Sequence, residues 1–485
     1  MGRDRSPGIG RRWAAARRNL LGIVPLVVVT ACLDGPSADT GEADGWTALF
    51  NGSDLSGWRQ VNGTAEYRVE DGAIVGVAVA DSPNSFLATE ETFSDFVLEL
   101  DFLVEGALNS GIQVRSESRP EVMDGRVHGY QVEIDPSARA WSAGIYDEAR
   151  RGWLFPMTLN PGAGAAFRPG EWNRLRVEAR GPVLKTWING VPAAYLIDEQ
   201  TAEGFVALQV HAVGSAEEAG QAVRWRDLRI RTAGLEPLPD EDFPFVVDTR
   251  PNRLSEAEAA LGWRLLWDGA TTAGWRGAHA ESFPQAGWEI ADGALTVLES
   301  GGGEAVHGGD IVTEEELAAF ELQVEFRLSE GANSGIKYFV TESYDAGGGS
   351  AIGLEYQLLD DARHPDASQG RDGNRTLGSL YDLIPAVKQP RFVRPPGEWN
   401  HARLVVRPDR TVEHWLNHQK VLEYVRESEA FLELVAISKY RDWEGFGRWE
   451  RGRLLLQDHG NRVSFRSIKL RELASDVLGS TSPAR

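Results

Sequence analysis

A chain of 485 residues is too long for a single hydrophobic core, so its length predicts two or three domains. The net charge of −22 argues against nucleic acid as a partner, because such a surface repels a phosphate backbone, whereas a neutral sugar or a divalent cation is compatible with it. The 53 glycines, the 23 prolines and the short apolar runs between turn residues predict an all-β chain, and the single cysteine excludes an internal disulfide.

The N-terminus has the composition of a secretion signal. Six arginines precede an apolar run over 20–31 that is too short to span a membrane as a mature helix. Residues 29–32, Val-Thr-Ala-Cys, resemble the bacterial lipobox, in which the cysteine is lipidated and becomes the new N-terminus. We therefore expect a signal peptide over 1–31, a lipid on Cys32, a polar tether over 32–44 and a lipid-anchored protein of the bacterial cell envelope, periplasmic or surface-exposed. The alternative is an ordinary signal peptide with an incidental cysteine.

The rest of the chain contains one unit written twice. Paired motifs recur in the same order in both halves: Trp46 to Gly52 with Trp263 to Gly269, Asn109 to Ile112 with Asn333 to Ile336, Gly170 to Asn173 with Gly397 to Asn400, and Leu208 to His211 with Leu456 to His459. The offset between the pairs grows along the chain. The second unit therefore carries an insertion that the first lacks, which we place around 438–453.

Short alternating runs separated by Asp-Gly, Asn-Gly and Pro-Gly turns predict hairpins within each unit. We expect two tandem jelly-roll β-sandwiches, over 45–234 and 253–474, with a linker over 235–252 and a tail over 475–485. In the first unit the runs predict the following strands: 96–103, 111–115, 129–135, 174–179 and 184–188. The capping box Ser255-Glu256-Ala257-Glu258 predicts a short helix that ends at Leu261.

One predicted strand of the second unit has a polar face. Residues 353–359 alternate, so Glu355 and Gln357 project to one side and an apolar row projects to the other. Two carboxylates and an imidazole follow at the strand exit, which favours a small-molecule site on a sheet over a solvated strand face. The first unit repeats the pattern with Gln131 and Glu133.

Taken together, the motifs resemble the 3-keto-disaccharide hydrolase family, also described as 3-keto-glucoside 1,2-lyase/3-keto-2-hydroxyglucal hydratase. The motifs are an opening Trp with a Phe/Trp-Asn/Asp-Gly turn, Asn-Ser-Gly-Ile, Gly-x-Glu-x-Gln, Gly-Glu-Trp-Asn, and Leu-Gln-x-His before Phe-Arg-Ser-Ile. The resemblance implies a concanavalin-like jelly roll, secretion by bacteria and the cleavage of 3-keto-glycosides. A ketone at carbon 3 acidifies the hydrogen on carbon 2; loss of that proton expels the group on carbon 1, and water then adds to the enone. This chemistry needs a base, an electrophile and an acid, and a divalent metal can be the electrophile.

In the second unit this resemblance makes Glu355 the first candidate for the base or for a metal ligand, and His459 its partner across the site. Gln357 would bind a sugar hydroxyl. Asp360 and His364 could hold a cation through oxygen and nitrogen. Each residue has an alternative as a surface polar group or a turn-former.

Three further candidates surround this strand. Lys439 lies in the predicted insertion, which is either a lid carrying a catalytic cation or a solvated loop. Tyr381 is expected to contact the substrate, and Trp443 to stack on a sugar ring. Lys337, directly after Asn-Ser-Gly-Ile, is better explained by a strand-entry turn.

The first unit departs from the family pattern. Gln131 stands where the motif has Glu, and Glu133 where it has Gln, which moves the carboxylate about 7 Å along the face. Glu133 and His211 are its catalytic candidates, and Tyr146 and Trp153 join Gln131 as sugar contacts. The first unit therefore acts on another substrate or only binds.

Two other classes of function remain open. One is a pair of lectin-like modules that bind glycans without cleaving them. The other is a glycosidase that uses two opposed carboxylates about 5 to 9.5 Å apart.

Overall fold

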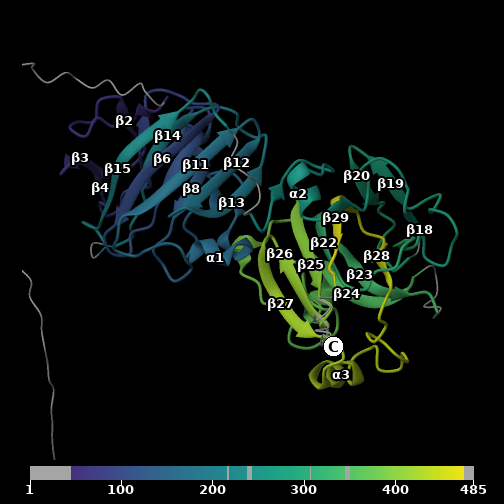
Figure 1. Ribbon diagram of the computed structural model, residues 1–485. Coiled ribbons are helices and arrows are strands. Elements are labelled where there is room, and N and C mark those ends of the chain that lie inside the picture. Colours follow the sequence, from purple (N-terminus) through teal and green to yellow (C-terminus); the bar gives the residue numbers. More distant parts are fainter. Residues whose placement is uncertain (1–44, 216–217, 237–242, 306, 344–349, 475–485) are drawn as a thin grey trace, which may run out of the picture. The chain divides into compact units, whose positions relative to one another are not determined.

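The structure is a computed structural model that describes residues 45–215, 218–236, 243–305, 307–343 and 350–474. The predicted signal peptide, Cys32, the tether and the C-terminal tail lie outside these residues. Within them the chain folds into two β-sandwiches, which confirms the predicted all-β class with two tandem units (Figure 1). No helix in the described ranges is long and apolar enough to cross a membrane.

Two sheets build the first sandwich. The nine-stranded sheet has the order β16-β13-β12-β11-β6-β15-β4-β3, with β1 beside β15. Its strands are β1 (Thr47–Ala48), β3 (Glu66–Glu70), β4 (Ala73–Val77), β6 (Phe96–Val104), β11 (Asn173–Arg180), β12 (Val183–Ile188), β13 (Val191–Ile197), β15 (Ala222–Arg231) and β16 (Val247–Asp248). The seven-stranded sheet, β10-β9-β8-β7-β14-β5-β2, has the strands β2 (Trp58–Val61), β5 (Ser85–Thr89), β7 (Ser110–Glu117), β8 (His128–Ile134), β9 (Ile145–Glu148), β10 (Gly152–Phe155) and β14 (Phe205–Val210).

The second sandwich repeats this plan. Its eight-stranded sheet has the order β19-β20-β29-β22-β25-β26-β27, with β17 beside β29. The strands are β17 (Arg264–Leu265), β19 (Trp288–Ala291), β20 (Ala294–Val297), β22 (Phe320–Leu328), β25 (Asn400–Val406), β26 (Thr411–Leu416), β27 (Gln419–Val425) and β29 (Val463–Glu472). The five-stranded sheet, β18-β21-β28-β23-β24, has the strands β18 (Trp275–Gly277), β21 (Ile311–Thr313), β23 (Asn333–Thr341), β24 (Ile352–Leu359) and β28 (Arg453–Leu456).

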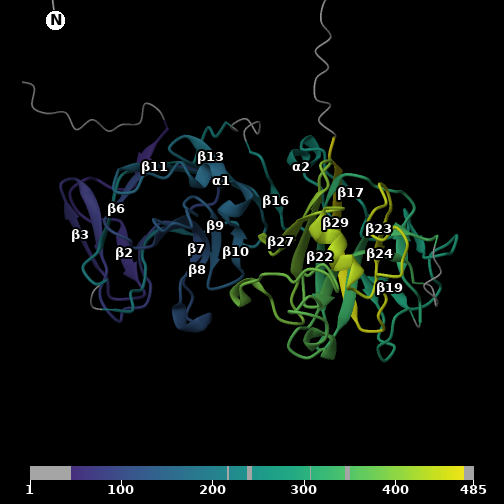
Figure 2. The ribbon, with the colours of Figure 1, turned by 90° about the horizontal axis from the view of Figure 1, so that it is seen from below.

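In each sandwich the core lies between the two sheets, because every strand turns alternate apolar side chains inward. In the second sandwich Val324 and Phe326 of β22 belong to the same buried cluster as Leu354 and Tyr356 of β24. The two layers that contain these strands lie side by side in Figure 2 as in Figure 1. The side chains between the inward-facing ones therefore project from the outer faces of the sheets.

Helices are few and short. The described helices are α1 (Pro161–Gly164), α2 (Glu256–Ala260) and α3 (Glu429–Ala436), with 3-10 turns η1 (Met123–Gly125), η2 (Met157–Leu159), η3 (Pro365–Ser368) and η4 (Pro390–Phe392). The predicted capping box is present before α2: Ser255 accepts from the amide of Glu258, whose carboxylate accepts from the amide of Ser255.

Two segments between the predicted elements differ from expectation. The stretch expected as a linker contributes β16, which pairs in parallel with β13 of the first sandwich. The insertion of the second unit fills 426–452, between β27 and β28, and it begins with α3 rather than near residue 438. The equivalent connection of the first sandwich, between β13 and β14, is only 198–204.

Candidate functional site

A hollow of about 460 Å³ lies on the outer face of the five-stranded sheet of the second sandwich. Strands β23 and β24 supply Lys337 and Glu355 to its wall, and the insertion supplies Lys439 and Trp443. Both strand residues alternate with buried core residues, so they point away from the core and into the hollow. The hollow is therefore built from the strand pair that carries the predicted polar face.

The register between β23 and β24 places the two charges of the strand pair side by side. Lys337 is the direct cross-strand partner of Glu355, and Gly335 is the partner of Gln357. Gly335 makes room for the carboxylate, since a Cβ there would lie 3.0 Å from Cδ of Glu355. The glycine of the Asn-Ser-Gly-Ile motif is thus needed for the close approach of Glu355.

Lys337 is the centre of a buried polar cluster. Its Nζ lies 3.1 Å from Glu304 Oε1 and 3.4 Å from Asp310 Oδ2. The hydroxyl of Ser350 donates to Glu304 at 2.7 Å, and the carbonyl of Ala351 accepts from Lys337 at 3.3 Å. Lys337 and Asp310 are buried, whereas Glu304 reaches solvent at the rim.

The pKa values of these groups are shifted in different directions. Burial raises the pKa of Glu355 to about 7, against the pull of the Lys337 and Lys439 charges. Burial also raises the pKa of Asp310 to about 6. Partial burial would raise the pKa of Glu304 as well, but the Lys337 charge and the Ser350 hydrogen bond lower it to about 2. Burial opposes the charge on Lys337, yet the neighbouring carboxylates hold its pKa above the usual range. Near neutral pH the site therefore contains a permanent cation and a carboxyl group that titrates in the working range.

Gln357 does not line the hollow, which corrects the prediction that it contacts the sugar. Its side chain is fully buried. In the amide orientation that satisfies both of its ends, it donates to Glu355 Oε1 at 3.1 Å and to the carbonyl of Ser334 at 3.0 Å. Gln357 therefore positions the carboxylate of Glu355.

The insertion brings a second cation to the hollow. Lys439 Nζ lies 4.2 Å from the centroid of the Tyr381 ring, and its backbone amide donates to Asp382 Oδ2 at 2.8 Å. The Lys439 side chain is exposed overall, but the desolvation of its ammonium group among these rings lowers its pKa. Tyr381 donates its hydroxyl hydrogen to Asp366 Oδ2 at 2.8 Å, and its ring supports Lys439.

His459 stands to one side of the hollow. Its ring is half-buried at 6.2 Å from the ring of His364, and no described residue is a hydrogen-bond partner of its Nδ1. Burial lowers the pKa of His459, while the Glu304 charge opposes that shift. The charges of Glu304 and Lys337 therefore act on both His459 and Glu355, and the described residues show no hydrogen bond between these two side chains.

The proposed cation ligands Asp360 and His364 serve the local backbone instead. Asp360 accepts from the amides of Gly331 at 2.8 Å and Ala362 at 3.2 Å, and His364 Nδ1 accepts from the amide of Asp366 at 3.2 Å. Across the described ranges, no group of three or more His, Cys, Asp or Glu side chains is arranged to hold a metal. Asp360 and His364 therefore do not fit a divalent metal. The presence of a metal cofactor itself stays a prediction.

The first sandwich has a hollow at the equivalent place on its seven-stranded sheet, and the predicted residues Gln131, Glu133, Tyr146, Trp153 and His211 line it. Glu133 is buried and accepts from Asn109 at 2.9 Å, from Arg139 at 3.0 Å and from Gln131 at 2.9 Å. Burial raises the pKa of Glu133 despite these bonds. His211 is exposed, its Nδ1 lies 2.7 Å from the carbonyl of Ala212, and it is not among the hydrogen-bond partners of Glu133.

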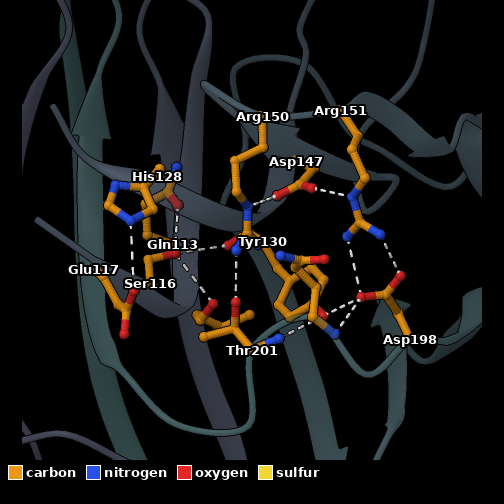
Figure 3. A network of polar contacts seen from close by, with 12 residues as sticks. Gln113, Ser116, Glu117, His128, Tyr130, Asp147, Arg150, Arg151, Asp198 and Thr201 are labelled. Atoms are coloured by element: carbon orange, nitrogen blue, oxygen red, sulfur yellow. Dashed lines mark hydrogen bonds and ion pairs between the residues drawn. The ribbon is translucent and has the colours of Figure 1, made fainter. Parts of the chain in front are cut away.

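An ion-pair network anchors the aromatic wall of this hollow (Figure 3). Asp147, fully buried on β9, pairs with Arg150 and Arg151 at 2.6 Å each, and Arg151 reaches Asp198 at 2.7 Å. The network fixes the β9–β10 hairpin that carries Tyr146 and Trp153. Trp153 lies on β10, so its ring is held by strand pairing as well as by this network.

Three members of the second site are not among the predicted site residues. The sequence predicts a strand-entry turn at Lys337, but its position two residues after Gly335 places it on the same outer face. Glu304 and Asp310 lie in the long connection before β21, where no strand pattern marks them. Alignment of the two units could have indicated Asp310, because this acid, directly before β21, stands where the first unit has the apolar Phe86.

Comparisons with known proteins connect this geometry to a family. The family model of the 3-keto-alpha-glucoside-1,2-lyase-like domain matches residues 45–231 and again residues 262–471. A 3-keto-disaccharide hydrolase from Bacteroides thetaiotaomicron is 39% identical over 234 residues, which are 44% of this chain and 79% of the relative. Among solved structures, a protein described as a glycosyl hydrolase from Parabacteroides distasonis is 29% identical with a TM-score of 0.40, over 46% of this chain and 100% of its own. A carbohydrate-binding module from Bacillus subtilis is 18% identical with a TM-score of 0.26, over 36% and 97%. The two family matches confirm the resemblance drawn from the motifs.

Proposed function

Because the chain belongs to the 3-keto-alpha-glucoside-1,2-lyase-like family, we propose that its second sandwich cleaves 3-keto-glycosides by removing the proton on carbon 2. One observation supports this proposal above the others. The carboxyl group of Glu355 is buried in a hollow with a pKa of about 7, and its cross-strand neighbour Lys337 lines the same hollow with a charge that lowers this pKa. A base is most effective when its pKa lies near the working pH.

In the proposed reaction, ionised Glu355 takes the proton from carbon 2 and becomes neutral. The electrons of the broken C–H bond form an enolate with its negative charge on the oxygen at carbon 3. Lys337 remains protonated because of its raised pKa, and it stabilises that charge without a proton transfer. Elimination then breaks the bond between carbon 1 and the leaving oxygen, which leaves an enone.

The leaving oxygen needs a proton, and Lys439 is the group suited to supply it. Its lowered pKa makes it a stronger acid than an ordinary lysine, and it faces the same hollow from the insertion. Water then adds across the enone and completes a net hydrolysis. Trp443, on the same insertion, is placed to cover a face of the sugar ring.

A two-carboxylate glycosidase is the second candidate, and it has its own supporting observation. Glu304 and Glu355 line one hollow with pKa values of about 2 and about 7. A glycosidase needs such a difference in pKa, because its nucleophile is ionised and its acid is protonated at the working pH. Such an enzyme would cleave glycosides that carry no ketone. The two candidates are therefore distinguished by substrate.

The decisive test is an assay of the full chain on p-nitrophenyl 3-keto-glucoside beside unoxidised p-nitrophenyl glucoside. We expect nitrophenol release from the ketone alone, and a kcat about 10² to 10⁴ lower in Glu355→Gln. Glu433→Gln, on the exposed face of α3, is the matched control and keeps full activity. Release from the unoxidised glucoside would favour the glycosidase, and release from neither substrate would overturn the catalytic proposal.

Lipid attachment through Cys32 and residence in the cell envelope remain proposals that rest on the lipobox-like sequence. They agree with a sugar-degrading role, because a tethered domain meets extracellular carbohydrate. In this proposal the lipid is the sole membrane contact.

A further inference from the structure

The first sandwich has lost the charged pair of the second. In both sandwiches the two central strands pair in the same register, with Gln113 opposite Gln131 where Lys337 is opposite Glu355. The two amides bond to each other at 2.7 Å. Ser116 donates to Gln113 Oε1 at 2.6 Å (Figure 3). Neither amide can take a proton from carbon or stabilise an enolate as a cation does.

The first sandwich also lacks a counterpart of Asp310, the carboxylate that lies 3.4 Å from Lys337 in the second sandwich. Leu208 pairs with Leu87 in the first sandwich as Leu456 pairs with Ile311 in the second, so Phe86 stands where Asp310 stands. Phe86 is buried in a small apolar cluster. The first sandwich therefore retains the hollow but has no carboxylate or ammonium at the positions equivalent to Glu355, Lys337 and Asp310, and its buried Glu133 is instead bound by Arg139, Asn109 and Gln131.

One polar side chain in this hollow lacks the partner that its counterpart has. Gln209 is 0% exposed and lines the hollow, yet neither atom of its amide has a hydrogen-bond partner among the described residues. Its counterpart Gln457 donates to Glu304 at 3.3 Å. A buried amide with both ends unsatisfied is costly, and a ligand with neighbouring hydroxyl groups would satisfy the donor and the acceptor together.

The rest of the wall fits a neutral sugar. The charged side chains that the first sandwich itself contributes to it are paired: Arg139 with Glu133 and Asp135 at 3.0 and 2.7 Å, Arg126 with Glu148 at 2.9 Å, and Arg151 with Asp198 at 2.7 Å. Trp153 and Tyr146 meet edge to face at 5.2 Å and offer apolar ring surface. Proteins bind uncharged carbohydrate with paired charges, with an amide that has free hydrogen-bonding capacity, and with aromatic surface.

From these observations we infer that the first sandwich is a non-catalytic site for an intact, uncharged saccharide, held by the amide of Gln209 and the rings of Trp153 and Tyr146. This inference goes beyond the proposed reaction and stands independently of it. The first sandwich would keep the polymer or oligosaccharide close while the second sandwich acts.

The test is calorimetric titration of the full chain carrying Glu355→Gln with trehalose, maltose and cellobiose, up to about 20 mM. We expect a dissociation constant in the millimolar range for at least one disaccharide, weakened tenfold or more by Trp153→Ala. Trp172→Ala is the matched control, because Trp172 is a half-buried tryptophan of the same sandwich that stacks under Arg226 away from the hollow. Absence of heat with all three sugars, or equal weakening by both tryptophan variants, would overturn the inference.

Gln209→Leu separates a binding role from a structural one. If Gln209 awaits a ligand, removal of its unsatisfied amide raises the melting temperature by about 2 to 4 °C while sugar affinity falls at least tenfold. A structural role predicts the opposite sign, with a lower melting temperature. Loss of stability, or unchanged affinity in a stably folded variant, would refute the assignment of Gln209.

Discussion

Glu355 is the residue at which burial and charge decide the proposed chemistry. Its folded pKa of about 7 means that the base form grows as the pH rises from 6 to 8. We therefore expect kcat/KM on a 3-keto-glucoside to rise with pH and level off above about 7. A pH profile of initial rates measures this directly. A rate that is flat or falling across that interval would show that another group is the base.

The same raised pKa carries a cost in stability. A carboxyl group whose folded pKa lies above its unfolded value of 4.5 destabilises the fold once it ionises, so stability is lost as the pH rises from about 4.5 to about 7. The size of the effect is on the order of 3 kcal/mol. Glu355→Gln should remove this loss, because Lys337 keeps Glu304 and Asp310 as counter-charges.

Urea unfolding of both proteins at pH 5 and pH 8 checks this prediction. Glu355→Gln should be the more stable protein at pH 8 and nearly equal to the native chain at pH 5. A variant that is less stable at pH 8 would mean that ionised Glu355 stabilises the cluster.

For single residues, the sequence predicts the face to which a side chain projects better than it predicts the contacts and the burial of that side chain. Alternation along 353–359 placed Glu355 on the outer face, where the structure has it. The same alternation could not show that Gln357 is covered, because burial on a sheet face depends on neighbouring strands and loops. Glu304 and Asp310 reach Lys337 from a distant connection, and only the fold brings such residues together.

At the scale of elements, the pairing of β23 with β24 sets the site. In Gly335→Ala the new methyl group would crowd the Glu355 carboxylate and displace it. A displacement of about 1 Å lowers the rate by about 10²-fold, so we expect kcat to fall strongly while the sandwich stays folded. Gly111→Ala, the equivalent change in the first sandwich, should crowd Gln131 similarly and leave kcat intact. Equal rates in the two variants would contradict this account.

The insertion depends on one carboxylate for its attachment near the hollow. Asp382 accepts from Arg375 and from the amide of Lys439, each at 2.8 Å. In Asp382→Ala we expect kcat/KM to fall about 10- to 100-fold, as expected for loss of a charged hydrogen bond, with faster hydrogen exchange over 437–443.

Asp382→Asn provides the control for that variant. It tolerates the positive φ of 60° at this position and keeps an acceptor for the Lys439 amide, so it should recover most of the activity. If the alanine variant kept normal exchange over 437–443, the attachment would not depend on Asp382.

The elements themselves were largely predictable because their signals are local. Period-two alternation and turn residues located five strands of the first unit, β6, β7, β8, β11 and β12, to within one or two residues, and the capping box located α2. The insertion was predicted from the growing motif offset, but α3 was not, since its Phe431 is held by packing against Tyr424. The strand β16 was missed because two residues carry no periodic pattern.

At the scale of the molecule, the repeat gives two sandwiches whose shared strands have the same order, with β9, β10 and β16 found, among the described residues, in the first alone, and with different chemistry on one face. The repeated core residues preserve the fold in both, and the outer faces are free to diverge because they do not pack. The proposed division into a catalytic and a binding copy rests on exchanges at three positions of this face, where Gln113, Gln131 and Phe86 stand in place of Lys337, Glu355 and Asp310. A repeat that preserves its core motifs is therefore poor evidence that both copies share an activity.

The charge of the whole chain supplies a last prediction about the substrate. With a net charge of −22, the protein repels anions over a range that salt shortens, from about 14 Å at 0.05 M to below 5 Å at 0.5 M. A neutral 3-keto-glycoside feels no such field, so kcat/KM should stay within about twofold between these NaCl concentrations. A 3-keto-glucoside with an anionic leaving group serves as the control, and its kcat/KM should rise with salt as the repulsion is screened. A steep fall with salt for the neutral substrate would show that the hollow binds through charge, and the assignment of an uncharged sugar ring beside Lys337 and Glu355 would be wrong.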